Sequence, residues 1–368
     1  MIRPWSHLLS ASLIWLCLSS NAAVAAGTPY VSGLARLTTA DDTASRGDAS
    51  GKLSITVWYP VAAGTAIEPL TFDGSSKSPY FDAGSFAAGT PMLPGTYPLI
   101  VISHGTGGTA MQMAWLARVL ASHGYIVAAP NHPGNNGLAP YTAQGFVLWW
   151  LRAHDLSRTI DAMLADPRYG PHIDRRRIAA AGFSLGGYTM IEIAGGRTSV
   201  KRFGAACARR DGDPTCSGPP EFPNLGQRVA ALLKTDAAFR AAYAGDGVSY
   251  RDPRVKAVFA IAPALAQAMI PSSLRQITIP VSIVVGTADP IAVGSLNGAV
   301  LAKAIPGATF AWIPNAGHYT FLDTCTAAGK AALKLFCGDR PGLDRAAVHA
   351  EVANRALAFF DGVLGGSR

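Results

Sequence analysis

The sequence has few cysteines and few charged residues. Of its 368 residues, 5 are cysteine and 15% are charged, whereas 49% are hydrophobic. No two cysteines form a CxxC pair, and no GK[ST] follows the glycine-rich segment 103–108. The first absence argues against a cysteine-clamped zinc site and the second against a P-loop nucleotide site. The large hydrophobic share argues against disorder and favours one large folded domain.

The first 26 residues have the layout of a secretory signal peptide. Arg3 precedes an apolar run from Leu8 to Leu18, and small residues follow up to Ala26. This run is too short to span about 30 Å of hydrocarbon, so we expect cleavage near Ala25 or Ala26, export to the periplasm or the medium, and no stable membrane span. The alternative is an uncleaved anchor helix. Cys17 lies inside the run and leaves with the signal.

Four cysteines then remain, in two pairs that are each close in sequence. They are Cys207, Cys216, Cys325 and Cys337. In an exported protein an even number of cysteines is typical of disulfides, so we expect Cys207 to pair with Cys216 and Cys325 with Cys337. A zinc site is the weaker alternative, since neither pair has metal-binding spacing.

The basic residues are spread along the chain. The formal net charge is +8 and the isoelectric point is about 9.4, which would suit a nucleic acid or an anionic surface. The one tight basic run, Arg175 to Arg177, lies just before an apolar, strand-like segment. We therefore interpret it as a solvated strand start and expect no nucleic-acid partner.

The pattern of the chain changes after residue 51. Residues 27–51 form a polar segment without core-forming periodicity, and 61–96, rich in Gly, Pro and Ser, are expected to form a long loop. Between them, residues 53–59 alternate polar and apolar side chains, which predicts a half-exposed strand.

Short, continuous apolar runs follow, and helical stretches separate most of them. The runs are residues 99–102, 125–129, 178–181, 255–261, 281–285 and 309–312. The helical stretches are roughly 110–123, 150–165, 185–194, 291–304 and 344–363. Such runs are typical of strands covered on both faces by helices, so the alternation predicts an α/β fold with a doubly wound, mostly parallel sheet within residues 52–363.

Residues 195–254 separate two strands by more than a crossover needs. They contain one cysteine pair, Pro219-Pro220 and a helical stretch from Leu225 to Tyr243. So long an interval is usually a functional insertion, and we predict an inserted cap over the site.

One pentapeptide carries the first chemical signal. Gly182-Phe183-Ser184-Leu185-Gly186 has the form GxSxG, which proves little alone in a chain with 39 glycines. Here it directly follows a strand run and opens a helical stretch, as the nucleophile elbow of an α/β-hydrolase does. We predict Ser184 to be the nucleophile, against the alternative of a serine that only caps the helix.

A serine nucleophile needs a histidine base and an acid that orients it. Asp289 follows the strand run 281–285, and His318 follows the run 309–312, in the chain order expected after the elbow serine. Asp323 also lies near His318 in sequence, but Asp289 is preferred because a buried strand would fix it at the catalytic edge. Other histidines, at 123, 154, 172 and 349, are expected to be structural.

The segment after the run 99–102 reads Ser103-His104-Gly105-Thr106-Gly107-Gly108. We expect the backbone amides of Thr106 and Leu185 to form the oxyanion hole, with a plain glycine-rich turn as the alternative.

Several segments together resemble a known family. LSITVWYP, PLIVISHGTGG, LASHGYIVAAPNHPGN, GFSLGGYT, GTADP and NAGHYTFL are similar to segments of the dienelactone-hydrolase-like α/β-hydrolases and of the platelet-activating-factor acetylhydrolase group. The resemblance covers about residues 52–322 without 195–254 and implies hydrolysis of small or short-acyl carboxylic esters. Dienelactone hydrolases use cysteine where this chain has Ser184, so activity on dienelactone itself is not implied.

The sequence therefore predicts an exported serine hydrolase that cleaves carboxylic esters through an acyl-enzyme. We expect a small-molecule ester as substrate and neither a metal nor an organic cofactor. An amidase or peptidase with the same triad is the first alternative, and a non-catalytic binding protein on the same fold is the second. Acyl length, alcohol portion, a polymeric substrate and oligomeric state are left open.

Overall fold

The structure is a computed structural model that describes Met1 and residues 30–41, 43–209 and 212–365. The predicted signal peptide, residues 1–26, lies outside the described residues except for Met1.

Within the described residues, eleven strands form one sheet. Its order is β10-β9-β8-β7-β5-β6-β2-β1-β4-β11, and β3 pairs with β4. The strands are β1 (Val31–Ala40), β2 (Lys52–Val61), β3 (Glu68–Ser75), β4 (Ser78–Ala88), β5 (Tyr97–Ser103), β6 (Ile126–Pro130), β7 (Ile173–Phe183), β8 (Val255–Ile261), β9 (Val281–Gly286), β10 (Thr309–Ile313) and β11 (Thr324–Cys325). Strands β5 to β10 pair in parallel, whereas β2 is antiparallel to β6 and to β1.

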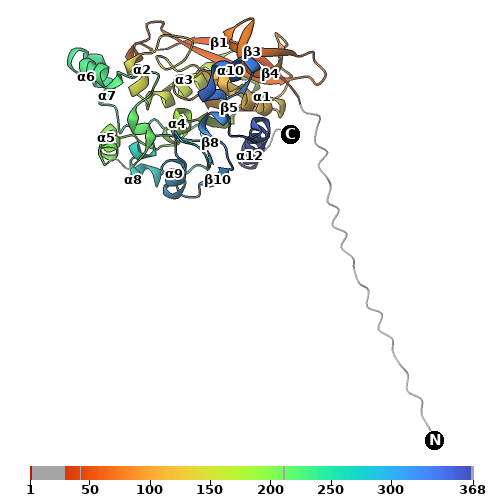
Figure 1. The fold of residues 1–368 in the computed structure, drawn as a ribbon. Coiled ribbons are helices and arrows are strands. Elements are labelled where there is room, and N and C mark those ends of the chain that lie inside the picture. The colour runs from red at the N-terminus through yellow and green to blue at the C-terminus, as the bar shows by residue number, and fades with distance from the viewer. Residues whose placement is uncertain (2–29, 42, 210–211, 366–368) are drawn as a thin grey trace.

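Helices cover both faces of this sheet (Figure 1). They are α1 (Ala114–Ser122), α2 (Ala143–Val147), α3 (Leu151–Ala165), α4 (Leu185–Ile193), α5 (Val200–Ala208), α6 (Leu225–Thr235), α7 (Ala237–Tyr243), α8 (Pro271–Leu274), α9 (Gly298–Ala304), α10 (Ala327–Ala332), α11 (Lys334–Cys337) and α12 (Arg345–Leu364). The predicted α/β fold with a mostly parallel, doubly wound sheet is confirmed.

The two faces of the sheet have separate cores, which explains the continuous apolar runs. Along β5, Leu99 and Val101 belong to the core on the face covered by α3, α4 and α9, whereas Ile100 and Ile102 belong to the core on the face covered by α1 and α12. Every β5 residue is therefore buried, because successive strand side chains point to opposite faces.

Two segments expected to lack regular structure contain strands. The polar segment 27–51 holds β1, which pairs with β2 along its whole length. The predicted loop 61–96 holds the β3–β4 hairpin, which closes between Ser75 and Ser78. Both predictions were wrong because backbone pairing with a neighbour, rather than apolar alternation, forms these strands: β3 is almost entirely exposed.

The basic run and one helix also differ from expectation. Arg175, Arg176 and Arg177 lie inside β7 rather than before it, in its exposed first half. The helix expected over 291–304 is regular only from Gly298.

The insertion 195–254 forms α5, a 3-10 helix at Pro214–Ser217, α6 and α7. Asp236 separates the last two helices and caps α7, since its side chain accepts a hydrogen bond of 2.9 Å from the Phe239 amide. In Figure 1, α6 and α7 lie at one edge of the molecule, away from α12.

Candidate active site

Ser184 lies on a sharp turn between β7 and α4. Its backbone has φ 57° and ψ −116°, a strained conformation that side chains rarely adopt. A Cβ on Gly186 would lie 1.9 Å from the Ser103 carbonyl oxygen, and one on Gly182 would lie 2.3 Å from the Gly186 carbonyl oxygen. The GxSxG glycines are therefore required because the elbow packs directly against its own backbone and that of β5.

Hydrogen bonds join Ser184, His318 and Asp289. The Ser184 hydroxyl lies 2.8 Å from His318 Nε2, and His318 Nδ1 lies 2.7 Å from Asp289 Oδ2. With the proton on Nδ1, the imidazole donates to Asp289 and accepts from Ser184, the orientation that a general base requires. We call these three residues the open arrangement.

Asp289 is itself held in place by the backbone. Its Oδ1 accepts hydrogen bonds from the Ile291 and Ala292 amides at 2.8 and 2.9 Å. Asp323, the other carboxylate weighed from the sequence, lies apart from His318: its Oδ1 accepts from the Trp115 amide at 2.8 Å, and burial raises its pKa well above the usual range. Of these two carboxylates, the one hydrogen-bonded to His318 is therefore that of Asp289.

The glycine-rich segment 103–108 packs beside the elbow. A Cβ on Gly105 would lie 3.4 Å from Ser184 Cβ. Within the described residues, neither the Thr106 nor the Leu185 amide donates a hydrogen bond to another part of the chain. Both amides are thus available to a substrate oxygen, as an oxyanion hole requires.

A pocket of about 880 Å³ opens over Ser184. Its lining includes Thr106, Leu185 and His318 together with several aromatic rings, among them Phe146, Trp149 and Phe203. The insertion contributes residues 214–221 to the wall. The segment expected to form a cap therefore borders the pocket.

A second serine, histidine and aspartate are joined in the same way, and the sequence analysis missed them. Ser103 Oγ lies 2.8 Å from His132 Nε2, and His132 Nδ1 lies 2.8 Å from Asp155 Oδ2. The available signal was positional, because Ser103 ends β5 and His132 follows β6. We call these residues the buried arrangement, since their exposed fractions are 0%, 1% and 0%.

Two arginines accompany the buried arrangement. Arg46 forms an ion pair of 3.0 Å with Asp155, and Arg152 donates to the carbonyl oxygen of His104 and, at 3.4 Å, to Ser103 Oγ. Burial, followed by the charges of Arg152 and Arg46, holds the pKa of His132 well below its usual value. His132 is therefore neutral, and Ser103 donates to it while accepting from Arg152.

This network also reaches the segment proposed for the oxyanion hole. The His132 amide donates to His104 Nε2 at 3.1 Å, so the His104 proton is on Nδ1, which donates to the Gly105 carbonyl at 2.7 Å. Ser103 and His104 directly precede Gly105 and Thr106 in the chain. The buried arrangement thus holds the base of the glycine-rich segment.

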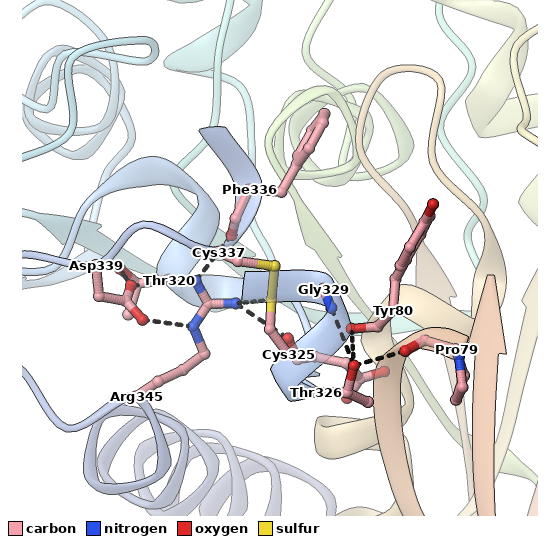
Figure 2. The surroundings of a disulfide bond; sticks show 11 residues. Pro79, Tyr80, Thr320, Cys325, Thr326, Gly329, Phe336, Cys337, Asp339 and Arg345 are labelled. Atoms are coloured by element: carbon pink, nitrogen blue, oxygen red, sulfur yellow. Dashed lines mark hydrogen bonds and ion pairs between the residues drawn. A yellow bond between two sulfur atoms is a disulfide. The ribbon is translucent and has the colours of Figure 1, made fainter. Parts of the chain in front are cut away.

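Both predicted cysteine pairs are disulfides in the structure, Cys207–Cys216 and Cys325–Cys337. Figure 2 shows the second, next to Arg345, whose guanidinium donates to Asp339 at 2.8 Å and to the Phe336 carbonyl at 2.8 Å. Thr320, two residues after His318, also donates to Asp339 at 2.8 Å. The disulfide loop therefore supports the segment that carries His318.

Within the described residues, no three or more His, Cys, Asp or Glu side chains gather in a way that would hold a metal ion. Across the same residues, no helix has the length and apolar character needed to cross a membrane.

Similarity to known proteins agrees with this geometry. Residues 100–328, more than half of the chain, match the model of the Alpha/beta hydrolase family. Cutinase est2 of Thermobifida alba is 34% identical over 126 residues, which is 33% of this chain and 39% of the cutinase. Cutinase 2 of Thermobifida cellulosilytica is 32% identical over 126 residues, 33% of this chain and 44% of that protein. The matched part thus spans less than half the length of these relatives.

One solved structure resembles almost the whole fold. A ferulic acid esterase from Streptomyces cinnamoneus superposes with a TM-score of 0.58 and 20% identity, covering 94% of this chain and 93% of that one. At this identity the likeness concerns the fold alone. The family match, by contrast, includes Ser103, Ser184, Asp289 and His318, and it shows that the chain belongs to the alpha/beta hydrolase family.

Proposed function

We propose that this protein is a serine esterase, cleaving carboxylic esters at the open arrangement. Ser184 is the nucleophile, His318 the base and Asp289 the residue that orients His318. The observation that carries the proposal is that His318 accepts a hydrogen bond from Ser184 and donates one to Asp289 at the floor of a pocket.

The proposed reaction uses these groups in two steps. Ser184 Oγ attacks the ester carbonyl while His318 Nε2 takes its proton, and the amides of Thr106 and Leu185 stabilise the oxygen that becomes negative. His318 then returns the proton to the departing alcohol. A water activated by His318 next cleaves the acyl-enzyme and releases the acid, which restores Ser184.

The substrate class rests on similarity. The resemblance of the sequence motifs to dienelactone-hydrolase-like and platelet-activating-factor acetylhydrolase enzymes supports small or short-acyl esters, and relatives named cutinase and ferulic acid esterase support ester cleavage. An amidase with the same triad is the second candidate, because it would need the same nucleophile and base.

Two assays test the proposal. A fluorophosphonate probe should label the wild type at Ser184, and Ser184→Ala should abolish labelling. A panel of p-nitrophenyl esters and p-nitroanilides of equal acyl length should show ester cleavage far above anilide cleavage. Labelling without ester cleavage would favour the amidase.

We also propose that the insertion 195–254 is a cap that sets acyl-chain preference, because residues 214–221 line the pocket. Shortening the insertion between its flanking elements should change the ranking of esters by acyl length. A uniform loss for every ester would instead indicate a purely structural role.

Export completes the proposal. The signal-like residues 1–26 and two disulfides suit an oxidising compartment. N-terminal sequencing of the protein recovered from periplasm or medium should find a mature chain that begins near residue 26 or 27, whereas an intact N-terminus would contradict cleavage.

A further inference from the structure

The chain as a whole is basic, whereas the charged residues that line the pocket are acidic. The protein has 31 Lys and Arg against 23 Asp and Glu. The described residues that line the pocket nevertheless include Asp73 and Glu221 but no Lys or Arg. A substrate group held there meets carboxylates without a compensating cation.

Of the two carboxylates that line the pocket, Glu221 is the one that interacts electrostatically with His318. It belongs to the insertion, directly after Pro219-Pro220, and is half-buried. A Cβ on Gly107, in the glycine-rich segment, would lie 3.5 Å from Glu221 Cγ. The carboxyl also interacts electrostatically with His318 and with the hydroxyl of Tyr319. Glu221 therefore lies in the pocket wall beside the glycine-rich segment.

No other described side chain neutralises this carboxyl. Among the described residues, Glu221 forms no ion pair with a lysine or arginine. Burial raises its pKa above the usual range, and the nearby His318 opposes that effect. Asp73, on the β3–β4 hairpin, is an exposed part of the same lining.

Aromatic rings form the rest of the wall near these carboxylates. Burial, followed by the charges of Glu221 and Asp73, raises the pKa of Tyr141. The Tyr141 hydroxyl donates to the Gly107 carbonyl at 2.9 Å. Phe146 and Trp149 continue the wall. Aromatic faces attract cations and accept neutral apolar groups, and carboxylates attract cations and repel anions.

We propose that the pocket accepts esters bearing an ammonium or a neutral group beyond the scissile bond and discriminates against esters bearing a carboxylate there, with Glu221 as the specificity-determining residue. This inference rests on the proposed ester hydrolysis. Partial desolvation of the pocket strengthens the effect relative to a charge on the open surface.

Two sets of matched esters test the charge preference. In the first set the acyl chain of a p-nitrophenyl ester ends in trimethylammonium, in the isosteric tert-butyl group or in carboxylate. In the second set the same three groups end the alcohol portion of a butanoate ester. Rates are measured at pH 8 and low ionic strength, where the carboxyl is ionised, and each charged ester is referred to the neutral ester of its own set.

In the wild type we expect kcat/KM for the ammonium ester to exceed that for the carboxylate ester by about tenfold or more in at least one set, mostly through KM. Glu221→Gln should reduce this ratio about tenfold and Glu221→Lys should invert it. Raising the salt concentration should shrink the ratio in the wild type.

The matched control is Glu68→Gln, which removes the same charge from an exposed position of β3 outside the pocket lining. It should leave the ratio unchanged. An equal ratio in the wild type and Glu221→Gln, or a preference for the carboxylate esters, would overturn the inference while leaving the esterase intact. Failure to hydrolyse even the neutral esters would overturn the proposed function and this inference together.

Discussion

The open and buried arrangements contain the same three residue types joined by the same kind of hydrogen bonds. Serine-to-histidine distances are 2.8 Å in both, and histidine-to-aspartate distances are 2.7 and 2.8 Å. Their surroundings differ. Ser184 lines the pocket beside two unbonded amides, whereas Ser103 is wholly buried and takes a hydrogen bond from Arg152.

Hydrogen-bond geometry alone therefore does not make a serine catalytic. A serine that a base can deprotonate still needs a route for the ester and donors for the developing negative charge. The open arrangement lines a pocket beside the Thr106 and Leu185 amides, whereas the serine of the buried arrangement is fully enclosed and offers no route for an ester. Two arginines near the buried histidine also disfavour the positive imidazolium that catalysis requires. We therefore interpret the buried arrangement as a support for the glycine-rich segment.

The largest expected difference comes from replacing the serine of each arrangement with alanine. Ser184→Ala should lower kcat for a p-nitrophenyl ester by about six orders of magnitude, since the nucleophile is lost and only the oxyanion donors remain. Ser103→Ala should lower it less than about tenfold and should reduce the free energy of unfolding by about 1–3 kcal/mol, because His132 Nε2 is left without a donor. Ester kinetics and urea unfolding measure both, and a comparable loss of activity in the two variants would contradict the assignment.

The next largest effects are expected from replacing the aspartates of the two arrangements. Asp289→Asn should lower kcat by about four orders of magnitude, because the amide no longer holds the required histidine tautomer. Asp155→Asn should chiefly destabilise the fold, by about 3–5 kcal/mol, since Arg46 loses a buried partner. Asp323→Asn should retain most activity. If Asp323→Asn lowered kcat more than Asp289→Asn did, while both variants stayed folded by circular dichroism, the triad acid would have to be reassigned to Asp323.

One glycine couples the two arrangements. A Cβ on Gly186 would lie 1.9 Å from the Ser103 oxygen and 2.8 Å from the His104 oxygen. Gly186→Ala should therefore push the elbow from the glycine-rich segment, lowering kcat tenfold or more and stability by about 1–3 kcal/mol. Gly362→Ala in α12, where a Cβ meets nothing within 4 Å, is the control and should stabilise slightly. Equal behaviour of the two variants would show that the contact is unimportant.

The smallest effect concerns the protonation of His132. Its pKa lies well below the usual 6.5, so below that pH the unfolded chain binds a proton that the folded protein does not. The contribution of His132 to the free energy of unfolding should therefore fall by about 1.4 kcal/mol for each pH unit below about 6.5. NMR titration of the imidazole should show no protonation near pH 6.5, and protonation there in the folded protein would contradict the sign.

Strong local patterns made much of the fold predictable. Continuous apolar runs identified β5, β6, β8 and β9 because these strands are buried on both faces. The β1 strand and the β3–β4 hairpin escaped prediction because backbone pairing, rather than a buried apolar pattern, forms them: β1 pairs with β2 and β4, and the almost entirely exposed β3 pairs with β4.

The candidate site was predictable for the same reason. Ser184, Asp289 and His318 each follow a strand whose sequence identifies it, and carboxyl ends of parallel strands meet at one edge. Glu221, Arg46 and Arg152 gave no such signal. Glu221 belongs to an insertion, and the two arginines meet Asp155 or His104 only through packing between elements.

The sequence alone thus determined the identities and chain order of the elbow, acid and histidine, because short-range turn chemistry and apolar patterning encode them. Only the tertiary structure decided which of two hydrogen-bonded serines meets a pocket and which charged residues, Glu221 among them, line that pocket. Those properties depend on burial and on distances between residues far apart in the chain, and neither quantity is a function of local sequence.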